Sequence, residues 1–215
     1  MTDLGFACLD ARADRFAAAP TLCFPLRITE AGGGAVHAVA LRCQIRIEPQ
    51  RRRYSGAESE LLADLFGEPS RWGETLRPLQ FALVSTMVPG FTGVTEIDLP
   101  VPVTYDLEVA AGKYFAALDE GEIPLLLLFS GTVFVRTPTG FSVEQVPWDR
   151  ETRHRLPVPL WRELMDRYFP GEGWLRLRTD TLRDLHRFKS AHALATWDDT
   201  MEALLARARA SEAAP

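Results

Sequence analysis

Lysine, cysteine and long apolar runs are all scarce in this chain of 215 residues. Only Lys113 and Lys189 are lysines, so nearly all positive charge comes from arginine, and acids still outnumber bases by 29 to 24. A nucleic-acid-binding protein needs a net or local basic surface. The net charge of −5 therefore argues against nucleic acid as a partner.

The three cysteines, Cys8, Cys23 and Cys43, form no CxxC motif, and no cysteine–histidine pattern predicts a metal site. The longest apolar run, residues 125–129, is far shorter than the ~20 residues that a membrane helix needs. Residues 1–16 contain acids and no apolar core of a signal peptide. We therefore expect a cytoplasmic protein with no membrane insertion.

Two adjoining segments predict a large sheet. Apolar residues occupy both alternating faces of residues 122–136, as in a strand that is buried from two sides. In residues 94–109 apolar residues alternate with prolines and acids, which is typical of a strand with one open face. Pro100, Pro102 and the acids beside them would protect a sheet edge against aggregation. The alternative is that the acids pair with arginines on a neighbouring strand.

Alternation also predicts a strand at residues 24–28 and another at 37–48, and the two are expected to form a hairpin. Residues 79–88 resemble a buried strand that ends at Pro89. Ser55 and Glu58 fit a capping box that opens a short amphipathic helix.

Helical spacing governs the last third of the chain, with helices expected at about 160–168, 182–188 and 197–209. Strands first and helices last predict an α+β fold, an antiparallel β-sheet or sandwich packed by C-terminal helices. We expect one domain with an N-terminal arm (1–20), a mainly β region (21–150) and a helical region that packs on the sheet (151–210).

No constellation predicts catalysis, so no catalytic, cofactor-binding or metal-binding residues are assigned. Ser130 lies mid-strand, without the glycine pattern of a nucleophile elbow. His154, between two arginines, is expected in a solvated loop. The acids around Gly121 are interpreted as an ordinary acid-rich turn on the surface. The basic run at 51–53 is interpreted as a solvated loop, with docking onto phosphate, RNA or an acidic partner as its alternative.

Large aromatic residues gather in the last third of the chain. Rings of this size usually lie in a core, where helices lock onto a sheet. The alternative is an apolar groove for a peptide or protein partner, because aromatic anchors contribute much of the binding energy in such contacts. The candidate partner-binding residues are Trp148, Trp161, Tyr168 and Trp174.

Two segments carry a resemblance: VPVTYDLEVAAGKYFAALDEGEIPLLLLFSGTVF and VPWDRETRHRLPVPLWRELMDRYFP. They resemble an uncharacterised bacterial family whose genes tend to lie beside high-affinity [NiFe]-hydrogenase genes. The resemblance covers roughly residues 20–205 and implies an association with hydrogenase production or assembly. The family has no established catalytic residues to transfer.

The order of elements is also similar to that of the SecB export chaperones, in which a helix opened by a Phe-Pro pair follows an antiparallel sheet. Here Leu156 and Pro157 stand at that place, and a further helix follows at 197–209. The likeness is one of layout, and a fold does not fix a function.

These observations favour a non-enzymatic cytosolic accessory protein, a chaperone-like factor that binds an immature hydrogenase subunit, a maturation factor or another polypeptide. The oligomeric state stays open, with a homo-oligomer among the alternatives. The second hypothesis is a small-molecule-binding protein or enzyme with a pocket between sheet and helices. Its candidate residues would be Asp106, Glu108, Tyr168 and His186.

Overall fold

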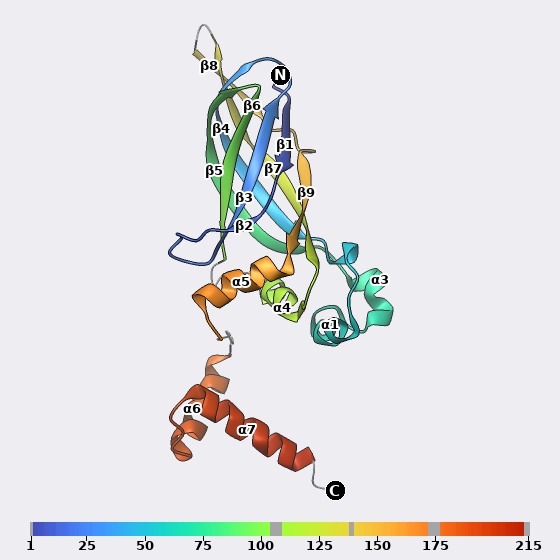
Figure 1. Ribbon diagram of the computed structural model, residues 1–215, viewed down its shortest axis with the longest axis vertical. Coiled ribbons are helices and arrows are strands. Elements are labelled where there is room, and N and C mark those ends of the chain that lie inside the picture. The colour runs from blue at the N-terminus through green and yellow to red at the C-terminus, as the bar shows by residue number, and fades with distance from the viewer. Residues whose placement is uncertain (1, 104–108, 138–139, 172–176, 213–215) are drawn as a thin grey trace. The chain divides into compact units, whose positions relative to one another are not determined.

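The computed structural model describes residues 2–103, 109–137, 140–171 and 177–212 (Figure 1). These residues form two compact units, one before and one after the boundary at residues 171 and 172. The first unit holds all nine strands described here, and the second holds two helices. Each unit is presented by itself.

The first of two antiparallel sheets is built around β3 (Thr21–Glu30). One side of β3 pairs with β6 (Val94–Pro102) along nearly its whole length. The other side pairs with β1 (Leu4–Cys8) and β2 (Arg12–Ala13). The predicted N-terminal arm of residues 1–20 therefore contributes two short strands to this sheet.

The second sheet has the order β5 (Leu79–Thr92), β4 (Ala35–Ile47), β7 (Glu122–Thr137). The far side of β7 is shared by β9 (Glu151–Pro157), which pairs with its first half, and β8 (Gly140–Gln145), which pairs with its second half. The predicted strand at 122–136 is confirmed.

The two sheets pack face to face around one apolar core. Phe6 of β1 stacks on Phe129 of β7 with ring centroids 4.3 Å apart. Leu22, Phe24 and Leu26 of β3 are buried, as are alternate residues of β4. Because neighbouring side chains of a strand point to opposite faces, each sheet buries one face in this core. The predicted α+β fold with antiparallel sheets is thus confirmed.

The predicted hairpin between the first two long strands is wrong. β3 pairs with β6 and β4 pairs with β5 and β7, so the chain crosses from one sheet to the other between residues 30 and 35. A second crossing lies between β5 and β6 at Gly93, whose carbonyl accepts a hydrogen bond from the Glu30 N–H (2.6 Å). The alternation of apolar and polar residues predicts a strand but does not predict which strand it pairs with.

Two predicted strand ends also differ from the structure. β5 continues through Pro89 to Thr92, which is permitted because β5 pairs on one side only and the missing N–H costs no ladder bond. The strand predicted to reach residue 109 ends at Pro102, and Val109 begins helix α4 (Val109–Ala117). The residues between, 104–108, lie outside the described part.

Two helices lie at one end of the sheets, α4 and α5 (Val158–Tyr168) (Figure 1). Trp161 of α5 stacks on Phe115 of α4 with centroids 4.1 Å apart, and both side chains are buried. The expected helix at 160–168 is therefore confirmed.

The segment between β4 and β5 holds the short helical elements. These are η1 (Pro49–Arg51), α1 (Gly56–Leu61), α2 (Ala63–Phe66), η2 (Pro69–Arg71) and α3 (Trp72–Thr75). The capping box at the start of α1 is confirmed: the Glu58 N–H donates to Ser55 Oγ (3.2 Å), and the Ser55 N–H donates to Glu58 Oε2 (2.9 Å).

The second unit is a helical hairpin of α6 (Thr179–Ala191) and α7 (Trp197–Glu212). Thr196 and Asp199 exchange hydrogen bonds of 2.9 and 3.0 Å at the start of α7, as in a capping box. The division after residue 171 leaves β9 and α5 with the sheets, although both belong to the predicted helical region 151–210. Among the described helices, none has the length and apolar character needed to cross a membrane.

Candidate binding face on the second sheet

The face of the second sheet that points away from the core carries few charges and many apolar or small side chains. We call it the outer face and define it by its cross-strand rows. The ladder registers set these rows as Leu83–Gln44–Leu128–Glu151, Ser85–Arg42–Ser130, Met87–Ala40–Thr132–Gln145 and Pro89–Ala38–Phe134–Val143. In these rows only Arg42 and Glu151 are ionisable, and Glu151 forms an ion pair with Arg153.

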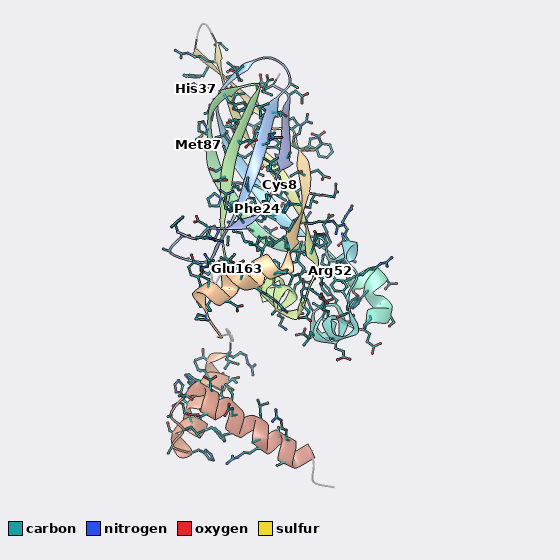
Figure 2. All side chains as sticks on the ribbon, in the orientation of Figure 1. Cys8, Phe24, His37, Arg52, Met87 and Glu163 are labelled. Carbon is teal, nitrogen blue, oxygen red and sulfur yellow. The ribbon has the colours of Figure 1, made fainter. Side chains whose placement is uncertain are left out.

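Several large apolar side chains on this face are exposed to an unusual degree. Leu83 is 59% exposed, Met87 62% and Val143 59%, while Phe141 beside them on β8 is 58% exposed. They form two pairs, one on β5 and one on β8, with the side chains of β4 and β7 between them. Single exposed apolar residues are normal, whereas several on one face mark an interaction site. Met87 is labelled in Figure 2 on the flank of the second sheet.

A bulge in β4 extends this face toward β8. The register between β4 and β7 shifts between Val36 and Ala38, so His37 is an extra residue without a partner on β7. Val36 takes the buried position, and His37, predicted at the start of the apolar strand face, is exposed. Its ring centroid lies 4.7 Å from that of Phe141. A bulge of this kind re-aims a side chain without ending the strand.

Arg42 lies at the centre of the outer face, in a shallow hollow of about 650 Å³. The hollow exists because the neighbours of Arg42 in its row, Ser85 and Ser130, are small. Within the described residues the Arg42 guanidinium has no carboxylate partner, whereas Arg153 further along the sheet pairs with Glu48 and Glu151. The outer face therefore offers an uncompensated positive charge among apolar side chains.

Gly131 keeps β4 and β7 close beneath this hollow. Its φ of +143° disfavours other residues, and a Cβ atom at this position would come within 2.1 Å of the Ala40 carbonyl oxygen. Its own carbonyl accepts a hydrogen bond from the Val146 N–H (2.9 Å). Gly131 thus lies where the far side of β7 changes its partner from β9 to β8.

The aromatic candidates from the sequence are scattered. Trp161 is only 7% exposed and lies in the core, whereas Trp148 is 91% exposed in the turn between β8 and β9. The Tyr168 hydroxyl donates to the Ala17 carbonyl (2.6 Å), which ties α5 to the N-terminal segment. Trp174 lies outside the described residues, as do Asp106 and Glu108. The three that the structure describes, Trp148, Trp161 and Tyr168, do not come together in one groove.

The basic run and the acidic turn meet in a buried network. Arg52, labelled in Figure 2, forms an ion pair with Glu58, and both side chains are less than a tenth exposed. Its guanidinium also donates to the carbonyls of Glu120 (2.6 Å) and Glu122 (3.2 Å). Glu58 accepts a further hydrogen bond from the Asp119 N–H (3.0 Å). The expectation of a solvated loop is therefore wrong for Arg52, which has a structural function.

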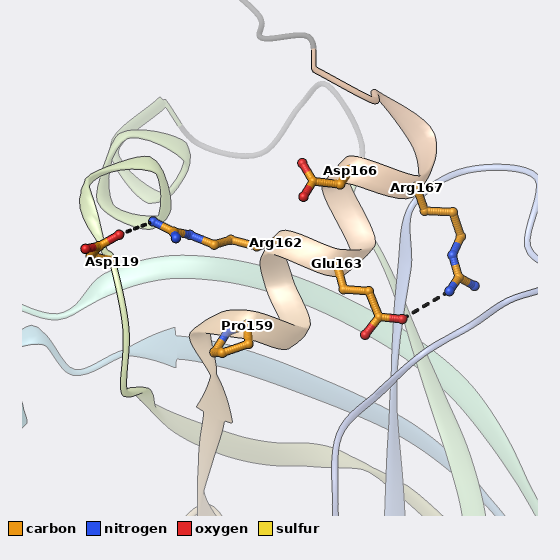
Figure 3. A pocket seen from close by; sticks show the side chains of 6 residues that line it. All are labelled: Asp119, Pro159, Arg162, Glu163, Asp166 and Arg167. Carbon is orange, nitrogen blue, oxygen red and sulfur yellow. Dashed lines mark hydrogen bonds and ion pairs between the residues drawn. The ribbon is translucent and has the colours of Figure 1, made fainter.

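A second hollow lies beside α5 and contains mostly charged residues (Figure 3). Arg162 pairs with Asp119 at 2.8 Å, and Arg167 pairs with Glu163 at 3.1 Å. Within each exposed pair the charges neutralise one another, and Asp166 is the remaining charged side chain of the hollow. His186, the remaining candidate of the enzyme hypothesis, belongs to the second unit, where its ring meets Trp197 at 4.7 Å.

Burial favours the neutral forms of the tyrosine and cysteine side chains in the interior. Burial raises the pKa of Tyr54 to about 12 and also raises the pKa of Tyr114, whose hydroxyl lies 2.9 Å from that of Tyr54. Burial likewise raises the pKa of Cys8 to about 11 and that of Cys43 to about 12, which opposes thiolate formation. These groups are unsuited to nucleophilic catalysis near neutral pH.

The sequence predicted a solvated loop at His154, and this prediction is wrong. It belongs to β9 opposite Leu125, and its ring meets Phe24 edge-on at 6.0 Å. Burial lowers the pKa of this imidazole, and its buried Nε2 atom has no hydrogen-bond partner within the described residues. In that same part of the chain, no cluster of three or more histidine, cysteine or acidic side chains could hold a metal ion.

A comparison with protein-family models gives one match over residues 1–213, described as a family of unknown function (DUF6084). The chain belongs to this family. None of the curated proteins compared with it matches.

Among solved structures, the chain is similar to β-glucosidase 3B from Thermotoga neapolitana in complex with α-D-glucose, at 13% identity and a TM-score of 0.26. That match covers 72% of this chain and 17% of the glucosidase. A β-glucosidase from Kluyveromyces marxianus matches at 10% identity and a TM-score of 0.23, over 72% of this chain and 15% of the enzyme. The chain thus spans about a sixth of the length of these enzymes. Because the similarity is so weak, we draw no conclusion about function from it.

The outer face does not follow from the pattern of residues 79–88, whose apolar side chains at both parities predict a buried strand. β5 instead buries Phe81 and Val88 and exposes Leu83 and Met87. Arg42 marks one side of β4 as open in the sequence, but only the strand register shows that Ser85 lies opposite it.

Proposed function

We propose that this protein is a non-catalytic accessory factor that binds another polypeptide on the outer face of its second sheet. The observation that carries the proposal is a set of large apolar side chains, each more than half exposed, on the two outermost strands of the order β5-β4-β7-β8: Leu83 and Met87 on β5, and Phe141 and Val143 on β8. Apolar surface of this kind is stabilised when a partner removes it from water.

The partner suggested by the sequence resemblance is an immature hydrogenase subunit or a maturation factor, met in the cytoplasm. The three cysteines are consistent with a reducing compartment, because each is a free thiol and two of them are buried. The layout resembling an export chaperone supports a client that is not yet folded.

The pocket-enzyme hypothesis receives less support. The two hollows described above are surface depressions, and four of the five charged side chains that line the one beside α5 form ion pairs with each other. The interior groups with raised pKa values line neither hollow.

The test is co-purification of the hydrogenase subunits with the tagged protein from a host that expresses the hydrogenase. A Leu83→Thr/Met87→Thr variant should lose the subunit and keep the wild-type melting temperature. The matched control is Val94→Thr on β6, which removes an apolar side chain of similar exposure (56%) from the other sheet and should retain the subunit. Equal recovery with both variants would overturn the outer face as the binding surface.

A further inference from the structure

The free edge of β5 presents an ordered set of backbone groups. β5 pairs only with β4 within the described residues. Pro89 lies opposite Ala38 and has no N–H, so this pair is one in which backbone groups point away from the partner strand. Such pairs recur at every second residue of an antiparallel ladder.

Three residues therefore direct their N–H and C=O groups toward the free edge: Met87 opposite Ala40, Ser85 opposite Arg42 and Leu83 opposite Gln44. No backbone hydrogen bond joins these groups to another described residue. The same residues place their side chains on the outer face, where Leu83 and Met87 are exposed. An unpaired row of this length is a template for a further strand.

The neighbouring edge strand of the first sheet is different. The Val103 N–H donates to the Pro20 carbonyl (2.7 Å), so residues of that parity point toward β3. Pro100 and Pro102 have the opposite parity, and their missing N–H groups therefore interrupt the free edge of β6. Prolines therefore block the free edge of β6, whereas the free edge of β5 stays open between Leu83 and Met87.

Charge identifies what the open edge would accept. A strand added beside β5 lies about 10 Å from β4, two inter-strand spacings away. In the added strand, one residue would lie opposite Ser85, in the same row as Arg42. Only the small Ser85 side chain would separate that residue from Arg42, so the unpaired guanidinium can reach across Ser85 to it. An acid at this position would neutralise Arg42, and residues two positions before and after it would lie against Leu83 and Met87.

We infer that the β5 edge binds an extended segment of the partner polypeptide as an added strand. The segment carries an acid with an apolar residue two positions to either side. Main-chain hydrogen bonds to Leu83, Ser85 and Met87 supply the docking mode, and Arg42 supplies the selectivity. This inference rests on the proposed function, since it specifies the binding mode of the client and the residue pattern of the segment that binds.

The test uses two labelled nine-residue peptides, TTVTETVTT and TTVTKTVTT, whose binding is followed by fluorescence anisotropy. The wild-type protein should bind the glutamate peptide about tenfold more tightly than the lysine peptide, as one favourable charge pair requires. Arg42→Glu should reverse that preference. Ser85→Pro should abolish binding of both, because proline blocks the edge at a position whose N–H makes no bond to β4.

Equal affinity of the wild-type protein for the two peptides would overturn the inference, as would undiminished binding by Ser85→Pro. A dimer that Ser85→Pro dissociates would overturn it too, by showing a second copy of the chain on this edge. If Ser85→Pro still recovers the hydrogenase subunit while Leu83→Thr/Met87→Thr does not, the proposed function stands and only the added strand fails. If the wild-type protein recovers no hydrogenase subunit and binds neither peptide, both the proposed function and the added-strand inference are wrong.

Discussion

Arg52 lies buried against Glu58 and joins the segment between β4 and β5 to the start of β7. Its guanidinium forms an ion pair with Glu58 of α1 and donates to the carbonyls of Glu120, just before β7, and of Glu122, the first residue of β7. The cation also lies 5.5 Å from the centre of the Tyr54 ring. A charge this deeply buried depends on its partner, because an unpaired ion in the interior is strongly disfavoured.

Removing either member of the pair should therefore be costly. We expect Arg52→Met to reduce the free energy of unfolding by about 3–5 kcal/mol, since Glu58 then stays buried without its cation. Urea unfolding followed by circular dichroism measures the change. Arg27→Met is the matched control, because its pair with Glu96 is half exposed and contributes only about 0–1 kcal/mol. Similar losses in the two variants would contradict the structural importance of Arg52.

Gly131→Ala should destabilise the second sheet. The added methyl group meets the Ala40 carbonyl and the backbone is held at a positive φ, each of which costs about 1–3 kcal/mol. Thermal unfolding tests this expectation. Gly112→Ala is the control, because its Cβ has open space within α4 and alanine should stabilise the helix by about 0.5–1 kcal/mol. A Gly131 variant as stable as the wild type would show that β7 relaxes freely at this bend.

Trp161 and Trp148 should respond oppositely to truncation. Trp161→Ala removes a ring stacked in the core and should cost about 3–5 kcal/mol of unfolding free energy. Trp148→Ala should change it by no more than about 0.5 kcal/mol, because the side chain is exposed. Guanidinium denaturation measures both values. Equal effects would place Trp161 outside the core, and Trp148→Ala remains the better variant for binding assays.

Acid should weaken the fold through His154. Burial lowers its pKa below the ordinary value of 6.5, so the unfolded chain binds more protons than the folded one below that pH. This contribution to stability is full above about pH 6.5 and is lost as the pH falls. Urea midpoints between pH 5 and 8 should decrease toward acid in the wild type and decrease less in His154→Gln. His37→Gln, which keeps His154, should retain the wild-type slope.

The sequence predicted the elements better than their partners. The apolar run at 122–136 and the capping box at Ser55 both became what their patterns indicate, because burial and capping are encoded locally. The hairpin of β3 and β4 did not form, since pairing depends on which distant strand completes each sheet. Local alternation contains no information of that kind.

The candidate site was harder to predict for a related reason. The aromatic residues of the C-terminal third were interpreted first as core, with a partner groove as the alternative, and Trp161 lies in the core. The exposed apolar side chains belong instead to β5 and β8, where the sequence resembled an ordinary buried sheet. Only the register, which places Arg42 beside Ser85, identifies the open face.

The crossing of the chain between the sheets also affects synthesis on the ribosome. β3 needs β6 and β4 needs β7, so the first 47 residues wait for partners that end at residue 137. At translation rates of about 5–20 residues per second, the delay for β4 is roughly 5–20 s. During this interval β4 can pair with β5, but the edge of β4 that will bind β7 stays open, which exposes the nascent N-terminal segment to aggregation.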